Sequence, residues 1–170
     1  TRGYDFGFSK STDEAMKIWN HDKVLGDVVW VIRKFRPDVI ITRFPEDQRA
    51  GHGHHSGSAV LAREAFAAAA DPNQYPEQLK RGVTVWQAKR ILWNTFNFGG
   101  NNTISENQFK VDVGTYNPLL GKGYGEIAAE SRSQHKSQGF GSSERRGRLT
   151  NALVLLEGDP VKADPFEGID

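Results

Sequence analysis

The sequence contains no cysteine among its 170 residues. Disulfide bonds and thiolate metal ligands are therefore excluded, and cysteine usage gives no indication of the redox compartment. No apolar run approaches the roughly 20 residues that a membrane-spanning helix needs. An excess of one charge is missing too, because 22 basic and 21 acidic residues leave a net charge of +1. This balance gives no electrostatic reason to expect nucleic acid or an anionic membrane as a partner.

The composition is that of an ordinary globular protein, with 37% hydrophobic and 25% charged residues. We expect residues 1–170 to form a single domain, because this length is sufficient for one hydrophobic core. The chain begins at Thr1 without a signal-peptide pattern, and residues 166–170 form no obvious closing element. We interpret both ends as cuts in a longer protein. Any targeting segment would then lie upstream, so the compartment stays open.

Predicted helices and strands alternate along the chain. Capping residues, among them Ser11 and Asn20, and helical spacing predict helices over residues 11–19, 21–36, 56–70 and 125–138. The spacing places Phe35 on the apolar face of the second helix. Apolar runs predict strands over residues 38–42 and 90–96, and a strand or short helix over 152–156. Apolar and polar residues alternate over 109–113, which predicts a half-exposed strand. The run 38–42 is typical of a strand buried on both faces of a parallel sheet. We expect residues 74–82, 99–102 and the remaining tail from about 140 to be irregular. The predicted fold class is α/β, a Rossmann-like three-layer sandwich with a mostly parallel sheet.

Three of the five histidines lie within four positions, as His52, His54 and His55. This segment follows the carboxyl end of the predicted strand 38–42, where ligands bind in open α/β sheets. Imidazole is a common ligand of zinc, and a catalytic zinc takes about three protein ligands. A single His-x-x-His pair is weak evidence, so further ligands would have to come from elsewhere. The alternative is a solvated loop whose histidines have no function.

Two stretches in the same order resemble the LmbE/PIG-L family of zinc-dependent N-deacetylases. The first is Pro37-Asp38-Val39-Ile40-Ile41-Thr42-Arg43 followed by Gly51-His52-Gly53-His54-His55 and a helix of small residues. The second is residues 125–138, which end in His135-Lys136-Ser137-Gln138. The resemblance covers residues 25–138. It implies hydrolysis of an N-acetyl group on an amino sugar or its conjugate, with zinc as cofactor and a small molecule as substrate.

The resemblance also implies roles for particular residues. His55 matches a metal ligand, and His52 matches the histidine that stabilises the oxyanion or donates a proton. Asp47 and Arg43 supply charged groups on the same loop and complete the candidate catalytic set. Gly53 and His54 depart from the family, which has Pro and Asp at these positions. For His135 we expect a structural role.

The family's early Ala-His-Pro-Asp-Asp-Glu motif does not occur in the chain. We expect it upstream of Thr1, so that the chain alone would be catalytically inactive. A rival interpretation is a non-catalytic Rossmann-like module that binds carbohydrate. A serine hydrolase and a dinucleotide-binding dehydrogenase are disfavoured, because neither Gly-x-Ser-x-Gly nor Gly-x-Gly-x-x-Gly is present. Trp86, Trp93, Asn94 and residues 99–102 could line a sugar site, although core and connecting roles are preferred. The oligomeric state stays open.

Overall fold

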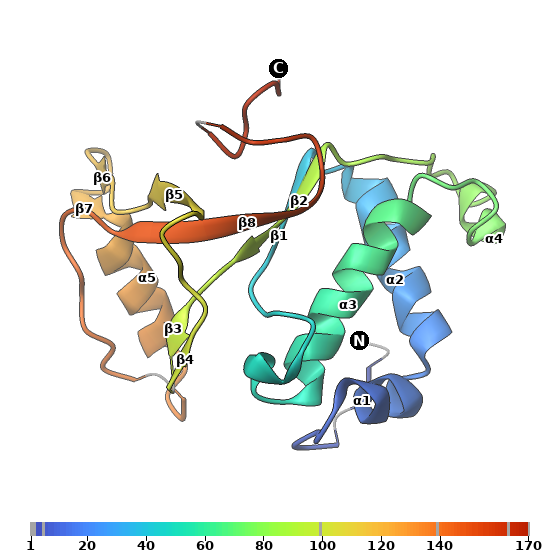
Figure 1. The fold of residues 1–170 in the computed structure, drawn as a ribbon, viewed down its shortest axis with the longest axis horizontal. Helices are drawn as coiled ribbons and strands as arrows, with labels where there is room; N and C mark the ends of the chain where they lie inside the picture. The colour runs from blue at the N-terminus through green and yellow to red at the C-terminus, as the bar shows by residue number, and fades with distance from the viewer. Residues whose placement is uncertain (1–2, 5, 99, 139, 163, 170) are drawn as a thin grey trace. The chain divides into compact units, whose positions relative to one another are not determined.

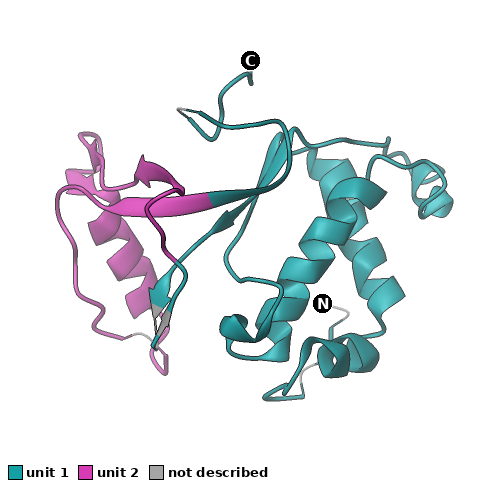
Figure 2. Ribbon diagram, viewed as in Figure 1, with its two compact units in different colours: residues 1–103, 154–170 teal, residues 104–153 magenta. Residues whose placement is uncertain are grey.

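The computed structural model describes residues 3–4, 6–98, 100–138, 140–162 and 164–169. The chain divides into two compact units, which are coloured separately in Figure 2. Unit 1 comprises residues 1–103 and 154–170, and unit 2 comprises residues 104–153. No helix among the described residues is long and apolar enough to cross a membrane.

Three helices of unit 1 form where the sequence predicts them (Figure 1). Helix α1 (Thr12–Trp19) begins after Ser11, whose hydroxyl accepts the Glu14 N–H at 3.2 Å. Helix α2 (His21–Phe35) begins after Asn20, whose side chain accepts the Lys23 N–H at 3.2 Å. Side-chain acceptors of this kind satisfy backbone donors that have no partner inside the helix. Helix α3 (Gly53–Ala68) starts three residues earlier than the predicted 56.

The apolar faces of these helices form most of the core. Buried side chains of α2 pack against α3 and its C-cap residue Ala69, in a cluster that contains Val29, Ile32, Ala65 and Ala69. The predicted face of α2 is wrong at Phe35, which is 79% exposed. Phe35 is the last residue of the helix, and Arg36 follows in the left-handed conformation with φ 56°. Phe35 lies one turn after Val31, which is 60% exposed, so it belongs to the exposed side of the helix.

The sheet of unit 1 contains one parallel pair. Strand β1 (Val39–Thr42) pairs with β2 (Arg90–Asn94), in a register that runs from Val39 opposite Arg90 to Thr42 opposite Trp93. In strand order β8 (Thr150–Gly158) comes next to β2. The expectation that both faces of β1 are buried is wrong, because Ile41 is 49% exposed. Among the described residues β1 is an edge strand, so it lacks a neighbour on one side.

Short elements complete unit 1. A 3-10 helix, η1 (Gln48–Ala50), lies between β1 and α3, and α4 (Pro76–Leu79) forms a single turn. Strands β3 (Asn97–Phe98) and β4 (Asn101–Asn102) pair antiparallel. The predicted irregular segment 74–82 is therefore wrong at α4, and the predicted loop 99–102 is wrong at β4. Gly99 lies outside the described residues.

Unit 2 consists of a hairpin, a helix and an antiparallel strand pair. Strand β5 (Phe109–Asp112) pairs with residues 150–153 of β8, and β6 (Tyr116–Asn117) pairs with β7 (Lys122–Gly123). Helix α5 (Tyr124–Ser133) ends earlier than the predicted 138. Strand β8 confirms the strand expected over 152–156 and extends it by two residues at each end. The α/β class is confirmed, whereas the described strands are mixed and a mostly parallel sheet is not confirmed.

Candidate functional site

The three clustered histidines lie at the start of α3. His52 is the N-cap residue, and His54 and His55 belong to the first turn of the helix. The rings of His52 and His55 are 3.8 Å apart between centroids, with planes inclined by 34°. The rings of His52 and His54 are 5.3 Å apart in an edge-to-face arrangement. The helix start thus gathers the predicted metal ligand, the predicted proton donor and a third imidazole.

His55 is held by a hydrogen bond and a stacked ring. Its Nδ1 lies 2.9 Å from the carbonyl oxygen of Ala50, which can only accept, so Nδ1 carries the proton. The ring of Phe44 stacks on the imidazole at 3.8 Å with planes inclined by 4°. A neutral His55 therefore presents its lone pair at Nε2. A ring N–H that donates to a backbone carbonyl is the usual outer-shell partner of a metal-ligating histidine.

His52 is less restrained. Its ring lies between Phe8, at 5.2 Å, and His55, and its Nδ1 is buried without a hydrogen-bond partner among the described residues. Burial lowers the pKa of His52, and the neighbouring imidazoles His55 and His54 lower it further. The neutral form is thus favoured, and a charge that developed beside the ring would be required to favour its protonation.

His54 makes different contacts from its two neighbours. Its Nδ1 lies 2.7 Å from the hydroxyl oxygen of Ser9, which also accepts the backbone N–H of His54 at 2.8 Å. The ring packs against Phe6, at 4.5 Å, and Trp19, at 4.9 Å, and these two rings also contact each other. His54 is therefore part of an aromatic cluster.

Asp47 is engaged by a neighbouring arginine. Its carboxylate accepts the backbone N–H of Arg49 at 2.9 Å and three guanidinium hydrogen bonds, the shortest from Nη2 at 2.6 Å. The hydrogen bonds from Arg49 hold the pKa of Asp47 below its ordinary value. Asp47 therefore stays ionised and is a weak base.

Arg43 makes its described contacts with residues that follow β2. Its Nη1 donates to the Thr95 carbonyl at 3.3 Å, and its guanidinium stands 5.3 Å from the centre of the Phe96 ring. Desolvation of the guanidinium lowers the pKa of Arg43. Its described contacts therefore tie this side chain to the segment after β2.

A cavity of about 580 Å³ opens beside the helix start. His52 and Asp47 both line it, together with the hydroxyl-bearing Ser11, Thr12 and Ser56. His55 and Arg43 are not among its described lining residues. The structure thus brings two of the four predicted site residues to one cavity, places His55 against His52, and leaves Arg43 outside.

A metal requires more ligands than the described residues offer together. No group of three or more histidine, aspartate or glutamate side chains among them is arranged to hold a metal ion. His55 fits zinc in its donor type and in its carbonyl partner, and it supplies a single nitrogen. The remaining ligands would have to come from outside the described residues.

The other candidate residues have varied surroundings. Trp86 donates its Nε1–H to the Pro37 carbonyl at 2.7 Å, which gives it a structural role. Trp93 Nε1 and Asn94 Oδ1 are buried without partners among the described residues. His135 lies after the end of α5 in unit 2, where it is exposed.

Sequence reasoning missed Ser9, Phe44 and Ala50, which hold the histidine rings. Ser9 contacts His54 across a sequence separation of 45. No local pattern in the sequence points to such a pairing.

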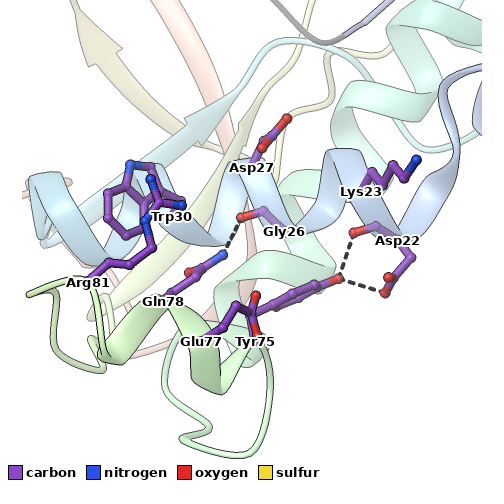
Figure 3. Close-up of a pocket in the computed structure, with 9 residues that line it drawn as sticks. All are labelled: Asp22, Lys23, Gly26, Asp27, Trp30, Tyr75, Glu77, Gln78 and Arg81. Atoms are coloured by element: carbon purple, nitrogen blue, oxygen red, sulfur yellow. Dashed lines mark hydrogen bonds between the residues drawn. The ribbon is translucent and has the colours of Figure 1, made fainter.

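A second cavity, of about 440 Å³, lies between α2 and α4 (Figure 3). The Tyr75 hydroxyl donates to Asp22 there, with oxygen distances of 2.9 and 3.1 Å, and Gln78 donates to the Gly26 carbonyl at 2.7 Å. Burial, followed by the Asp22 carboxylate, raises the pKa of Tyr75 to about 12. These polar groups are hydrogen-bonded to one another, and none of them belongs to the predicted site.

Comparison with known proteins gives two relatives with the same name. The chain is 31% identical over 87 residues to a 1D-myo-inositol 2-acetamido-2-deoxy-alpha-D-glucopyranoside deacetylase of Geodermatophilus obscurus. The matched region covers 49% of this chain and 27% of that protein. It is 36% identical over 73 residues to the deacetylase of that name from Streptomyces avermitilis. That match covers 43% of this chain and 23% of the relative. The matches span about a quarter of the length of these relatives. No family model matches the chain. The similarity supports a deacetylase family for this chain.

Proposed function

We propose that this chain forms part of a zinc-dependent N-deacetylase that removes an acetyl group from an amino sugar or its conjugate. The observation that carries the proposal is the bond from His55 Nδ1 to the Ala50 carbonyl, which leaves Nε2 available to a metal. The similarity to two deacetylases of an acetylated amino-sugar inositol supports the reaction class and the kind of substrate. Both matches cover only part of each protein, so substrate and activity are proposals here.

His55 would hold the metal, and His52 would act on the substrate beside it. A bound zinc would polarise the amide carbonyl and activate water. His52, whose ring is 3.8 Å from that of His55, would take up a proton released by the attacking water as negative charge develops on the carbonyl oxygen, would stabilise that charge, and would pass the proton to the leaving amine. The amine needs this proton because it is a very poor leaving group as an anion.

Asp47 and Arg43 would serve in binding rather than in proton transfer. Asp47 lines the cavity with His52, and its lowered pKa keeps a carboxylate available to accept hydrogen bonds from sugar hydroxyl groups. Arg43 is tied to Thr95 and would need to rotate to reach a ligand. The remaining metal ligands and the general base would come from residues beyond those described. A Rossmann-like fold would place them on a further parallel strand along the open edge of β1.

The experiment is a comparison of wild-type and His55→Ala forms of the full-length gene product. We expect the wild type to deacetylate 1D-myo-inositol 2-acetamido-2-deoxy-α-D-glucopyranoside and to contain about one zinc per chain. We expect His55→Ala to lose at least roughly 100-fold in kcat/KM together with its zinc. His135→Ala is the matched control, because this exposed histidine lies in unit 2. Equal rates and equal zinc contents in wild type and His55→Ala would remove the metal assignment.

A non-catalytic carbohydrate-binding module is the second candidate. It is favoured by one observation, namely that the described residues assemble no set of three metal ligands. Binding of the same acetylated sugar without hydrolysis by the zinc-loaded full-length protein would support this alternative. Hydrolysis would exclude it.

A further inference from the structure

The start of α3 is capped by a residue from a distant part of the chain. The N–H of Gly53 donates to the carbonyl of Ser9 at 3.0 Å, and the N–H of His54 donates to the hydroxyl of Ser9 at 2.8 Å. The N–H of His55 donates to the carbonyl of His52 at 3.1 Å. The first three backbone N–H groups of the helix therefore have hydrogen-bond partners other than the His52 side chain.

This arrangement is unusual for an N-cap. The N-cap residue is commonly Ser, Thr, Asp or Asn, whose side chain accepts one of the first helical N–H groups. His52 occupies the N-cap position and makes no such bond. Because Ser9 supplies the capping hydrogen bonds, the imidazole of His52 is not needed to cap the helix.

Ser9 also determines the state of His54. Ser9 is 0% exposed, and its hydroxyl has two partners, the backbone N–H and the Nδ1 of His54. The hydroxyl oxygen accepts the amide proton, and Nδ1, at 2.7 Å, is the one acceptor among the described residues for the buried hydroxyl's own proton. A neutral His54 then carries its proton on Nε2. The same bond holds the ring against Phe6 and Trp19.

The residue at position 53 fits this segment closely. A Cβ atom added to Gly53 would lie 1.9 Å from the Ser11 carbonyl oxygen, which is far inside van der Waals contact. Proline would in addition lack the N–H that Gly53 donates to Ser9. Residues 9–11 and Gly53 therefore form one close-packed contact, which glycine alone permits.

We propose that Ser9 is a positioning residue for the histidine site. It caps α3 in place of His52, retains His54 in the aromatic cluster and thereby leaves His52 and His55 as the pair of imidazoles that acts. The contacts of Ser9 do not depend on the reaction, whereas its effect on turnover rests on the proposed deacetylase function.

The test is the tautomeric state of each histidine, measured by 15N NMR at one pH at which the imidazoles are neutral. In the wild-type chain we expect Nε2–H at His54 and Nδ1–H at His55. In Ser9→Ala we expect a mixture of tautomers at His54 and weaker nuclear Overhauser contacts between its ring and Trp19, while His55 stays Nδ1–H. Ser58→Ala is the matched control, because the Ser58 hydroxyl donates to the His54 carbonyl at 2.7 Å on the same helix without capping it.

Several outcomes would overturn the proposal. They are an Nδ1–H tautomer at His54 in the wild type, an unchanged His54 in Ser9→Ala, or the same change in Ser58→Ala. If Ser9→Ala does not fold, the wild-type measurement still decides whether Ser9 donates to His54.

Kinetics of the full-length protein distinguish a failure of the proposed role of Ser9 from a failure of the proposed deacetylase function. We expect Ser9→Ala to lower kcat roughly tenfold with KM within about twofold, because the ring of His54, 5.3 Å from that of His52, would no longer hold it in place, while remote binding contacts remain. Ser58→Ala should retain the wild-type values. A wild type that is inactive despite the expected tautomers would refute the proposed function and leave the positioning contacts standing. Normal kcat in Ser9→Ala, with an active wild type, would refute positioning alone.

Discussion

Unit 1 and unit 2 are stabilised by different balances of apolar and polar contacts. Unit 1 contains the three apolar clusters found among the described residues, and Ile91 and Val29 are completely buried there. Unit 2 leaves Leu119 94% exposed. Its described contacts include ion pairs, such as the 2.8 Å pair between Glu126 and Arg146.

The difference explains why the histidine site lies in unit 1. A chemical group acts well only if its neighbours hold it in place, and close-packed side chains supply that restraint. The α3 residues Ala65 and Phe66 belong to two apolar clusters, while the first turn of the same helix carries the histidines. The packed end of α3 therefore anchors the end that carries the imidazoles.

The largest expected effect is the loss of a core side chain in unit 1. Ile91→Ala should lower the free energy of unfolding by about 2–5 kcal/mol, because it removes buried methyl groups and leaves a cavity. Urea unfolding followed by tryptophan fluorescence measures the change. Ile18→Ala is the control, since Ile18 is 42% exposed on α1. Equal losses in both variants would contradict the importance of the core.

A smaller effect is expected where α3 meets the segment before α1. Gly53→Ala should cost about 1–3 kcal/mol, because the new methyl group would overlap the Ser11 carbonyl and force the backbone to move. Thermal unfolding by circular dichroism measures this. Gly57→Ala is a suitable control, because its Cβ would meet only the flexible end of Met16, at 2.6 Å. A larger loss in Gly57→Ala would argue against the close contact.

In unit 2 we expect a weaker, pH-dependent effect from Glu126. The backbone N–H of Gly123 and then Arg146 hold the pKa of Glu126 below its ordinary 4.5. A lowered folded-state pKa contributes stability above pH 4.5 and loses it as the pH falls through the folded value. Glu126→Gln should therefore speed hydrogen exchange in α5 at pH 7, and the difference from wild type should disappear in acid. Glu106→Gln, at a carboxylate 97% exposed, should change nothing.

The smallest effect is expected at the tip of the β6–β7 hairpin. Leu119→Ser should change the free energy of unfolding by less than about 0.5 kcal/mol, because exposed substitutions remove little packing. Chemical denaturation of the chain measures it. A loss comparable to that of Ile91→Ala would mean that Leu119 is covered, which would reverse the contrast between the two units.

Sequence patterns predicted what depends on neighbouring residues. The caps at Ser11 and Asn20, the strand at Val39–Thr42 and the alternation along Phe109–Asp112 are confirmed, since each depends on contacts a few residues apart. The turn α4 and the exposure of Phe35 and Ile41 were not predicted, because they depend on which surfaces the rest of the chain covers. The roles of His52, His55, Asp47 and Arg43 stay predictions.

The sequence by itself determined that three imidazoles gather between a short apolar strand and a helix of small residues, because chain connectivity and local capping suffice for that. The tertiary structure decided which imidazole does what. The carbonyl of Ala50 orients His55, the distant Ser9 holds His54, and His52 alone keeps a ring without hydrogen bonds to the described residues. Three identical side chains differ only in their surroundings, and a separation of 45 residues between partners leaves no local pattern to read.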